Sequence, residues 1–319
     1  MSDDLPSPVP RPPVSSAVLV AMAVVVVVLT VAIDAVVLTR GPTATSPATA
    51  PPASRPSLDA YRGLGSWVDI FDQQAWKDPA AAVADMASHG VRTIFIETGN
   101  SHSSTAFKEV PAIETFIREA HARGMRVVAW YLPYFKSEAL DLDRVTQAIR
   151  FTTSDGQSFD GFALDIESSA VKPESKRILA LESLSLKIRA AAGPAYPLGA
   201  IIPSPVGLAR KSGYWDAFPY TTIARAYDVI LPMGYYTYHA KGASAVATDV
   251  AGNIRIIRAQ PGCATIPIHM IGGIAGKSNP AEVAAFVHAA GEGGCVGASL
   301  YEWAGTSSGQ WQELRAVAP

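Results

Sequence analysis

Two carboxylates two positions apart, Asp165 and Glu167, are the residues of this sequence best placed for acid–base chemistry. They end the segment 160–167, which the sequence pattern predicts to be a β-strand. Side chains alternate along a strand, so both carboxylates point to one face and the apolar residues around them to the other. Mutual repulsion and partial burial are expected to raise one pKa, leaving a protonated acid beside an ionised partner. The alternative is a pair of surface or N-cap acids at a strand–helix junction.

The elements around this pair repeat a strand–helix unit. From Tyr61 onward, short runs of β-branched and aromatic residues alternate with longer runs at helical period, as in parallel βαβ units. The predicted strands cover residues 64–70, 91–97, 125–131, 160–167, 198–203, 229–233, 266–271 and 296–301. Eight units predict an α/β fold, a (β/α)8 TIM barrel over residues 59–319. A doubly wound open sheet is the main rival, but the glycines of segment 63–65 precede the first strand, which disfavours a dinucleotide site.

The C-terminal ends of the predicted strands are polar and aromatic, and barrel active sites lie at these ends. Asp165 and Glu167 are the catalytic candidates. The candidate substrate-binding residues are Asp69, Glu97, Tyr131, Tyr235, Tyr236, Glu302 and Trp303. Flat aromatic rings suit the apolar faces of pyranoses, so these residues predict a carbohydrate site. If the chemistry uses two protein carboxylates, Glu302 or Glu97 is the candidate for the second.

The motif Asp160-Gly161-x-x-x-Asp165-x-Glu167 resembles the strand-four signature of glycoside hydrolase family 18, the chitinase-like barrels, which reads Asp-Gly-x-Asp-x-Asp-x-Glu. The resemblance implies that Glu167 is the general acid/base and that Asp165 orients the substrate N-acetyl group. Segment 233–236, Met-Gly-Tyr-Tyr, resembles the family's Met-x-Tyr-Asp segment, which gives Tyr235 a contact to the N-acetyl carbonyl. Trp303 resembles the tryptophan beneath the central sugar. Ala163 replaces the family's middle aspartate, and a bare Asp-x-Glu also resembles family 25 lysozyme-type barrels.

The resemblance implies a glycoside hydrolase-like protein that acts on a polymer containing N-acetylhexosamine. In the substrate-assisted reaction of such barrels the acetamido oxygen attacks the anomeric carbon, so no protein nucleophile is required. Two other functions stay open. The replacement at Ala163 is compatible with a barrel that binds glycan without turnover. A different barrel chemistry, such as metal-dependent phosphodiester cleavage, is the third hypothesis.

The N-terminal segments predict an anchored domain. Residues 1–15 form a short tail, and residues 16–39 are predicted as a transmembrane signal-anchor helix because the run Ala17–Ile33 carries no charge. Residues 40–58 form a Pro/Thr/Ala/Ser-rich disordered linker, whose composition suits an extended stalk. We expect a single-pass protein of the cell membrane with its barrel on the extracellular side. A cleaved secretory signal is the alternative.

Composition narrows the partners. A formal net charge of -2 and a pI near 6.3 provide no basic field, so we expect no nucleic-acid partner. The six histidines include no pair with metal-ligand spacing beside acids, and there is no phosphate loop, so neither a metal nor a cofactor is predicted. Cys263 and Cys295 precede neighbouring predicted strands, which is compatible with a disulfide or with two buried free thiols. The oligomeric state is not predicted.

Overall fold

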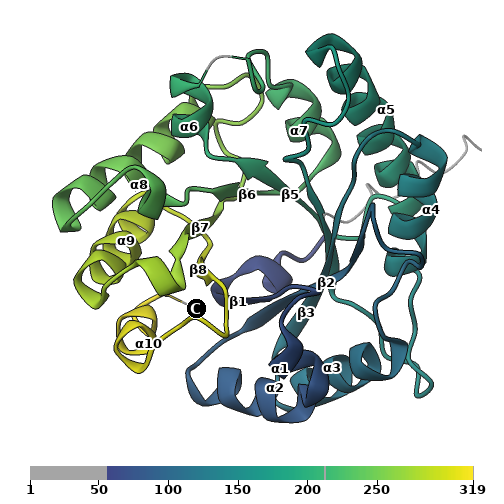
Figure 1. Ribbon diagram of the computed structural model, residues 1–319, viewed down its shortest axis with the longest axis horizontal. Helices are drawn as coiled ribbons and strands as arrows, with labels where there is room; N and C mark the ends of the chain where they lie inside the picture. The colour runs from purple at the N-terminus through teal and green to yellow at the C-terminus, as the bar shows by residue number, and fades with distance from the viewer. Residues whose placement is uncertain (1–55, 212, 319) are drawn as a thin grey trace, which may run out of the picture. The chain divides into compact units, whose positions relative to one another are not determined.

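The computed structural model describes residues 56–211 and 213–318, which form a closed barrel of parallel strands surrounded by helices (Figure 1). The strands pair in chain order, and the last pairs with the first. They are β1 Gly63–Val68, β2 Thr93–Asn100, β3 Arg126–Leu132, β4 Gly161–Asp165, β5 Leu198–Pro203, β6 Val229–Met233, β7 His269–Ile274 and β8 Gly297–Tyr301. The predicted (β/α)8 barrel is confirmed.

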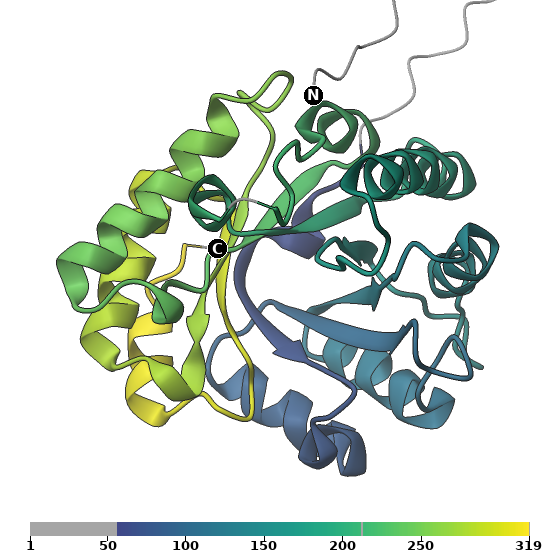
Figure 2. The same cartoon turned by 45° about the horizontal axis from the view of Figure 1, so that its top comes forward.

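The helices begin at the capping signals that the sequence carries. Asp78 accepts a hydrogen bond from the Ala81 amide, and Pro79 opens the next helix, where its missing amide proton costs nothing. Asn279 and Glu282 form a reciprocal capping box. The helices that cover the barrel in both views (Figures 1 and 2) are α1 Gln73–Lys77, α2 Pro79–Ser88, α3 Val110–Ala122, α4 Glu138–Ile149, α5 Glu174–Ala192, α6 Pro205–Arg210, α7 Tyr220–Ala226, α8 Ala243–Arg258, α9 Pro280–Glu292 and α10 Ser308–Leu314. Short 3-10 turns are η1 Asp59–Tyr61, η2 Tyr236–Tyr238 and η3 Ala275–Lys277.

Side chains of the strands divide between two apolar layers. One set packs beneath the helices, and the other fills the inside of the barrel. Inside, the rings of Trp67 and Phe95 stack with centroids 4.3 Å apart. Tyr61, fully buried, donates a hydrogen bond to the Phe162 carbonyl at 2.8 Å. The inside of the barrel is therefore a packed core, and open space is left only toward the strand ends.

A buried histidine joins three strands inside this core. The Nδ1 of His269 lies 2.9 Å from the Tyr61 carbonyl and must donate to it, which leaves Nε2 to accept from the Ser299 hydroxyl at 3.0 Å. Ser299 in turn accepts from the indole nitrogen of Trp67 at 2.8 Å. Burial lowers the pKa of His269 to about 4, because the charged ring would lose its hydration. The network therefore requires the neutral imidazole.

Two further expectations concern the N-terminal segments and the two cysteines. The predicted membrane segment 16–39 and linker residues 40–55 lie outside the described residues. Among the residues that are described, no helix combines the length and the apolar composition needed to cross a membrane. Of the two alternatives for Cys263 and Cys295, a disulfide or two free thiols, the structure shows two free thiols. Cys295 precedes β8 by two residues, whereas Cys263 lies six residues before β7, and its thiol contacts the Tyr220 carbonyl instead.

The neutral His269 predicts a measurable dependence of stability on pH. Its folded pKa of about 4 lies below the ordinary value of 6.5, so the unfolded chain binds the proton more tightly in that window. As pH falls from about 6.5 to about 4, this site alone should cost the fold roughly 3 kcal/mol. Denaturant titrations followed by tryptophan fluorescence measure the free energy of unfolding of the wild type and of His269→Gln. The difference between the two should decrease by roughly 3 kcal/mol from pH 7 to pH 4.

The matched control is His288→Gln on the exposed face of α9. Its stability should stay within about 0.5 kcal/mol of the wild type across the same range. A gap for His269→Gln that is the same at pH 7 and pH 4 would show that the histidine is not held neutral.

Candidate active site

Strand β4 places the predicted acid pair at the mouth of the barrel. Ala163 packs inside the barrel, and Phe162 and Leu164 lie beneath the helices, so the next inward position is Asp165. The strand ends there, two residues earlier than predicted. Glu167 follows in the connection to α5 and lines an open pocket. The charge of Glu167 acts on Asp165, so the two carboxylates lie near each other.

Asp165 is the more enclosed member of the pair. Asp165 is 6% exposed, and its Oδ1 has no hydrogen-bond partner among the described residues. Burial raises its pKa well above the ordinary value, and the charges of Glu167 and Glu97 raise it further. Burial also raises the pKa of Glu167. Two neighbouring carboxyl groups that both resist ionisation favour a state in which the pair retains a proton.

A second group of acids lies across the mouth, on β1, β2 and the end of β8. Tyr301 donates a 2.6 Å hydrogen bond to Asp69, and Glu97 accepts from the Ile70 amide at 3.0 Å. Burial and, to a lesser degree, the charge of Asp69 raise the pKa of Glu97 to about 7, although the hydrogen bonds from the Ile70 amide and the Asn100 side chain lower it. Burial, followed by a hydrogen bond with Asp69, raises the pKa of Glu302 to about 7. These predicted site residues therefore surround the same opening as Asp165.

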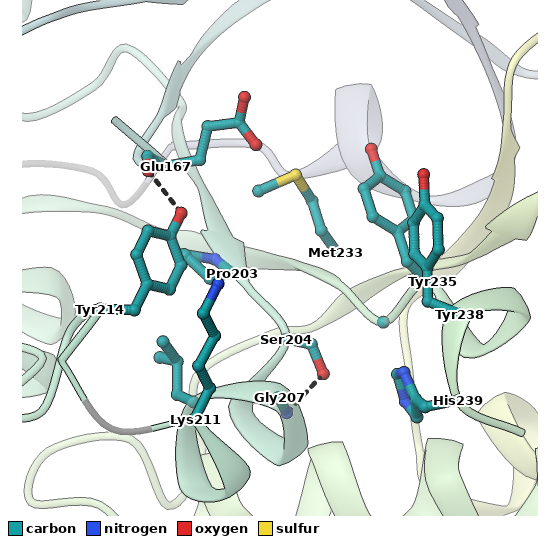
Figure 3. A pocket seen from close by; sticks show the side chains of 12 residues that line it. Glu167, Pro203, Ser204, Gly207, Lys211, Tyr214, Met233, Tyr235, Tyr238 and His239 are labelled. Atoms are coloured by element: carbon teal, nitrogen blue, oxygen red, sulfur yellow. Dashed lines mark hydrogen bonds between the residues drawn. The ribbon is translucent and has the colours of Figure 1, made fainter. Parts of the chain in front are cut away.

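The pocket beside Glu167 has a volume of about 240 Å³ and lies between the ends of β5 and β6 (Figure 3). The Tyr214 hydroxyl donates to the Glu167 carbonyl and so holds the backbone that carries the acid. Tyr235 and Tyr238 form the opposite wall, with their hydroxyl groups pointing the same way (Figure 3). Lys211 extends beside the Tyr214 ring toward the Glu167 end (Figure 3). Three tyrosines thus line the pocket together with aliphatic and polar residues.

Tyr235 connects the pocket to the acid pair. Burial raises its pKa well above the ordinary value, and the charges of Asp165 and Glu167 add to the shift, so the phenol stays neutral beside them. Its backbone has φ 39°, in the left-handed region that is costly for a side chain with a Cβ. The ring packs against Tyr301 with centroids 6.1 Å apart. Tyr235 therefore joins the two groups of polar residues at the mouth.

Three of the predicted mouth residues lie elsewhere. Tyr131 points beneath the helices and donates to Asp141 at 2.7 Å. Tyr236 bonds to Ser278 at 2.7 Å in the same layer, and the Trp303 indole donates to Asp85 of α2 at 2.9 Å. Strand alternation explains the first case, since its neighbour Trp130 is the residue that faces inward. These three side chains are not part of the pocket.

The structure adds pocket residues that sequence analysis missed. Lys211 and Tyr214 come from the irregular connection after β5, and Met233 ends β6. Ser204 and His239 complete the polar part of the wall. Only Met233 carried a usable signal, because alternation along β6 points it inward. Within residues 56–211 and 213–318, no cluster of three or more His, Cys, Asp or Glu is arranged to hold a metal ion.

Comparison with solved structures relates this barrel to glycosidases. No protein-family model and no curated protein sequence matches the chain. A chitinase from Chromobacterium violaceum superposes with TM-score 0.58 and 13% identity, covering 81% of this chain and 99% of that one. An endo-beta-1,4-mannanase from Thermotoga petrophila gives 0.61 and 10%, covering 78% and 69%. A glycoside hydrolase family 18 N-acetylglucosaminidase from Paenibacillus barengoltzii gives 0.54 and 11%, covering 80% and 98%. The chain has the fold of these glycosidase barrels.

The unfavourable environment of Asp165 predicts that neutralising it stabilises the fold. Because the folded pKa is raised, the penalty is present above that pKa and disappears as pH falls toward the ordinary value of 3.8. We expect Asp165→Asn to raise the free energy of unfolding by about 1–3 kcal/mol at pH 8 and to leave it nearly unchanged at pH 4. Denaturant titrations at the two pH values measure both quantities.

Asp141→Asn is the matched control. Asp141 is also buried with a raised pKa, but its oxygens accept from the Tyr131 hydroxyl and the Phe135 amide. Its replacement should therefore lower stability by about 1–2 kcal/mol at pH 8. If Asp165→Asn lowers the free energy of unfolding at pH 8, the conclusion that burial of the ionised Asp165 is unfavourable is contradicted.

Proposed function

We propose that this protein hydrolyses the glycosidic bonds of a polysaccharide that contains N-acetylhexosamine, with Glu167 as general acid/base and Asp165 assisting. The observation that carries the proposal is the pair itself: two interacting carboxyl groups enclosed at the mouth of a barrel, one of them lining an open aromatic pocket. The glycosidase fold supports it, since chitinases and an N-acetylglucosaminidase share the architecture.

The distribution of the proton within the pair gives each acid its role. Burial favours the neutral form of both carboxyl groups. A bound acetamido group brings its N–H to Asp165, and a hydrogen bond to the charged form stabilises that form. The proton of the pair is then held by Glu167, which can donate it to the glycosidic oxygen as the bond to C1 breaks.

The remaining bond changes of the reaction return the site to its starting state. The acetamido oxygen forms a bond to C1 as the leaving group departs, and the positive charge of the resulting ring is stabilised by ionised Asp165. Glu167, now ionised, accepts a proton from the water that attacks C1, and the bond between C1 and the acetamido oxygen breaks, which regenerates the N-acetyl group. The neutral hydroxyl of Tyr235, placed beside both acids, is suited to donate to the acetamido oxygen and hold it in line. Glu302 is not required as a nucleophile in this scheme.

A barrel that binds glycan without turnover is the second candidate function. The observation that favours it is Ala163, which faces inward and pairs in register with Trp130 where the resembled family has a further carboxylate. The pocket and its aromatic wall would remain useful for binding alone. Turnover by the wild type distinguishes the two candidates.

Glutamine substitutions separate the two candidates and the two possible acids. Glu167→Gln should lower kcat on N-acetylglucosamine oligomers about 100- to 10,000-fold, because the amide cannot donate the proton, while Kd changes little. Product release by the full-length chain is followed by chromatography, and Kd by calorimetry. Glu302→Gln should retain far more activity than Glu167→Gln.

Three outcomes would contradict parts of this scheme. Undiminished hydrolysis by Glu167→Gln rules out its role as general acid. Loss of hydrolysis with Glu302→Gln alone indicates a second protein carboxylate. Equal rates on glucose oligomers, which lack the acetamido group, exclude assistance by the substrate. Binding without any hydrolysis by the wild type would support the glycan-binding barrel.

We also propose that residues 16–39 anchor the protein in the cell membrane, with the barrel on the extracellular side. The uncharged run Ala17–Ile33 is suited to a hydrocarbon environment, and the Pro-rich linker can separate the barrel from the bilayer. Protease added to intact cells that express the full-length chain should release the barrel by cutting within residues 40–58. Protection of the barrel until the cells are lysed would reverse the proposed orientation.

A further inference from the structure

The polar groups at the barrel mouth are unevenly distributed by charge. Asp69, Glu97 and Glu302 gather on the side of β1, β2 and β8. The pocket between β5 and β6 has Glu167 at one end, and the bases in its wall are Lys211 and His239. A ligand that lies across the mouth therefore meets acids at one side and bases at the other. Such polarity favours an anionic substituent in the pocket.

Lys211 is available to a ligand in this pocket. Its ammonium group lies 5.3 Å from the centroid of the Tyr214 ring, and Figure 3 shows the chain extending along that ring toward Glu167. Among the described residues it makes neither an ion pair nor a side-chain hydrogen bond. Burial is the cause of the raised pKa of Glu167, so the acid is not held ionised by the lysine. The positive charge of Lys211 is therefore not used within the pocket.

His239 is held in place by a buried polar network. Its Nε2 lies 2.7 Å from Asp249, a residue 5% exposed, so this nitrogen donates to the carboxylate. Asp249 also accepts from the Asn253 amide at 3.1 Å, and Asn253 accepts from the Ser204 hydroxyl at 2.9 Å. The network fixes the ring at the pocket wall and leaves Nδ1 without a partner among the described residues.

We infer that the pocket takes a carboxylate-bearing unit of a polysaccharide that contains N-acetylhexosamine, with Lys211 as the group that recognises the anion. This inference rests on the proposed function, because Glu167 locates the sugar. A hollow of about 240 Å³ is smaller than the cavities that hold drug-sized ligands and suits about one sugar unit. The one lysine in the pocket wall matches a single carboxylate, which belongs either to a uronic acid unit or to an acid attached through an ether to the sugar ring.

Binding measurements on a form without turnover test the inference. The full-length chain with Glu167→Gln is titrated with a peptide-free tetrasaccharide of alternating N-acetylglucosamine and N-acetylmuramic acid, and with the methyl ester of the same tetrasaccharide. A hyaluronan tetrasaccharide and its methyl ester form the second pair. We expect one of the two acids to bind about tenfold more tightly than its ester, since a charge-assisted hydrogen bond is lost on esterification. The pair that shows the preference identifies the source of the carboxylate.

Lysine substitutions then test whether Lys211 causes the preference for the acid over its ester. Lys211→Met, in the same background, should bring the ratio of ester to acid Kd close to one. Lys77→Met is the matched control, because Lys77 is an exposed lysine at the end of α1, which follows β1 rather than β5 or β6. It should keep the wild-type ratio. The preference should also weaken as ionic strength rises.

The possible failures separate this inference from the proposed function. Equal binding of acid and ester, an acid preference that survives Lys211→Met, or no binding of any of the four probes overturns the inference. Hydrolysis of neutral N-acetylglucosamine oligomers by the wild type is measured in parallel and reports on the proposed function alone. Hydrolysis without acid preference overturns only the inference, whereas acid preference without hydrolysis overturns only the proposed turnover.

Discussion

Strand side chains in a closed barrel alternate between an enclosed interior and a layer beneath the helices. This alternation decides which residues of this chain can meet a ligand. Asp165 is two positions from Ala163 on β4 and faces inward like it, whereas the intervening Leu164 packs outward. The same rule removes Tyr131 from the mouth and puts Trp130 inside. The polar side chains that remain at the mouth are the ones that face inward, because an inward-facing side chain has no helix to pack against.

The interior changes character from the bottom of the barrel to the top. Below, the hydrogen bonds of His269 and Tyr61 are satisfied by backbone and hydroxyl partners, and no charge is needed. At the top, Asp165 has an oxygen without a partner, and its pKa is raised by burial. An unsatisfied buried carboxyl is costly for folding and persists where a ligand supplies the missing hydrogen bond. The hydrogen bonds of His269 and Tyr61 in the lower layer provide rigid support of the kind that such a site requires.

The sequence was sufficient for the barrel and for the inward direction of Asp165, because both depend on short-range periodicity. Its limits are equally physical. The strand pattern did not reveal that β3 turns Trp130, not Tyr131, inward, since both neighbours are aromatic and large enough to pack on either face. Lys211 and Tyr214 lie in an irregular connection, whose path is set by tertiary contacts such as the hydrogen bond from Tyr214 to the Glu167 carbonyl. The two cysteines precede neighbouring strands by unequal lengths of chain, which spacing along the sequence alone did not reveal.

Because position 163 is an alanine, the charged groups that shift the pKa of Asp165 lie elsewhere. A carboxylate at that position would lie one inward step below Asp165 on the same strand and could share its proton. Here the charges that raise the pKa of Asp165 come from Glu167, two positions further along the chain, and from Glu97 across the mouth. Glu97 itself has a pKa of about 7, so its charge, and with it the repulsion on Asp165, decreases as pH falls through neutrality. The environment of Asp165 therefore includes, besides burial and the charge of Glu167, a carboxyl group on a different strand.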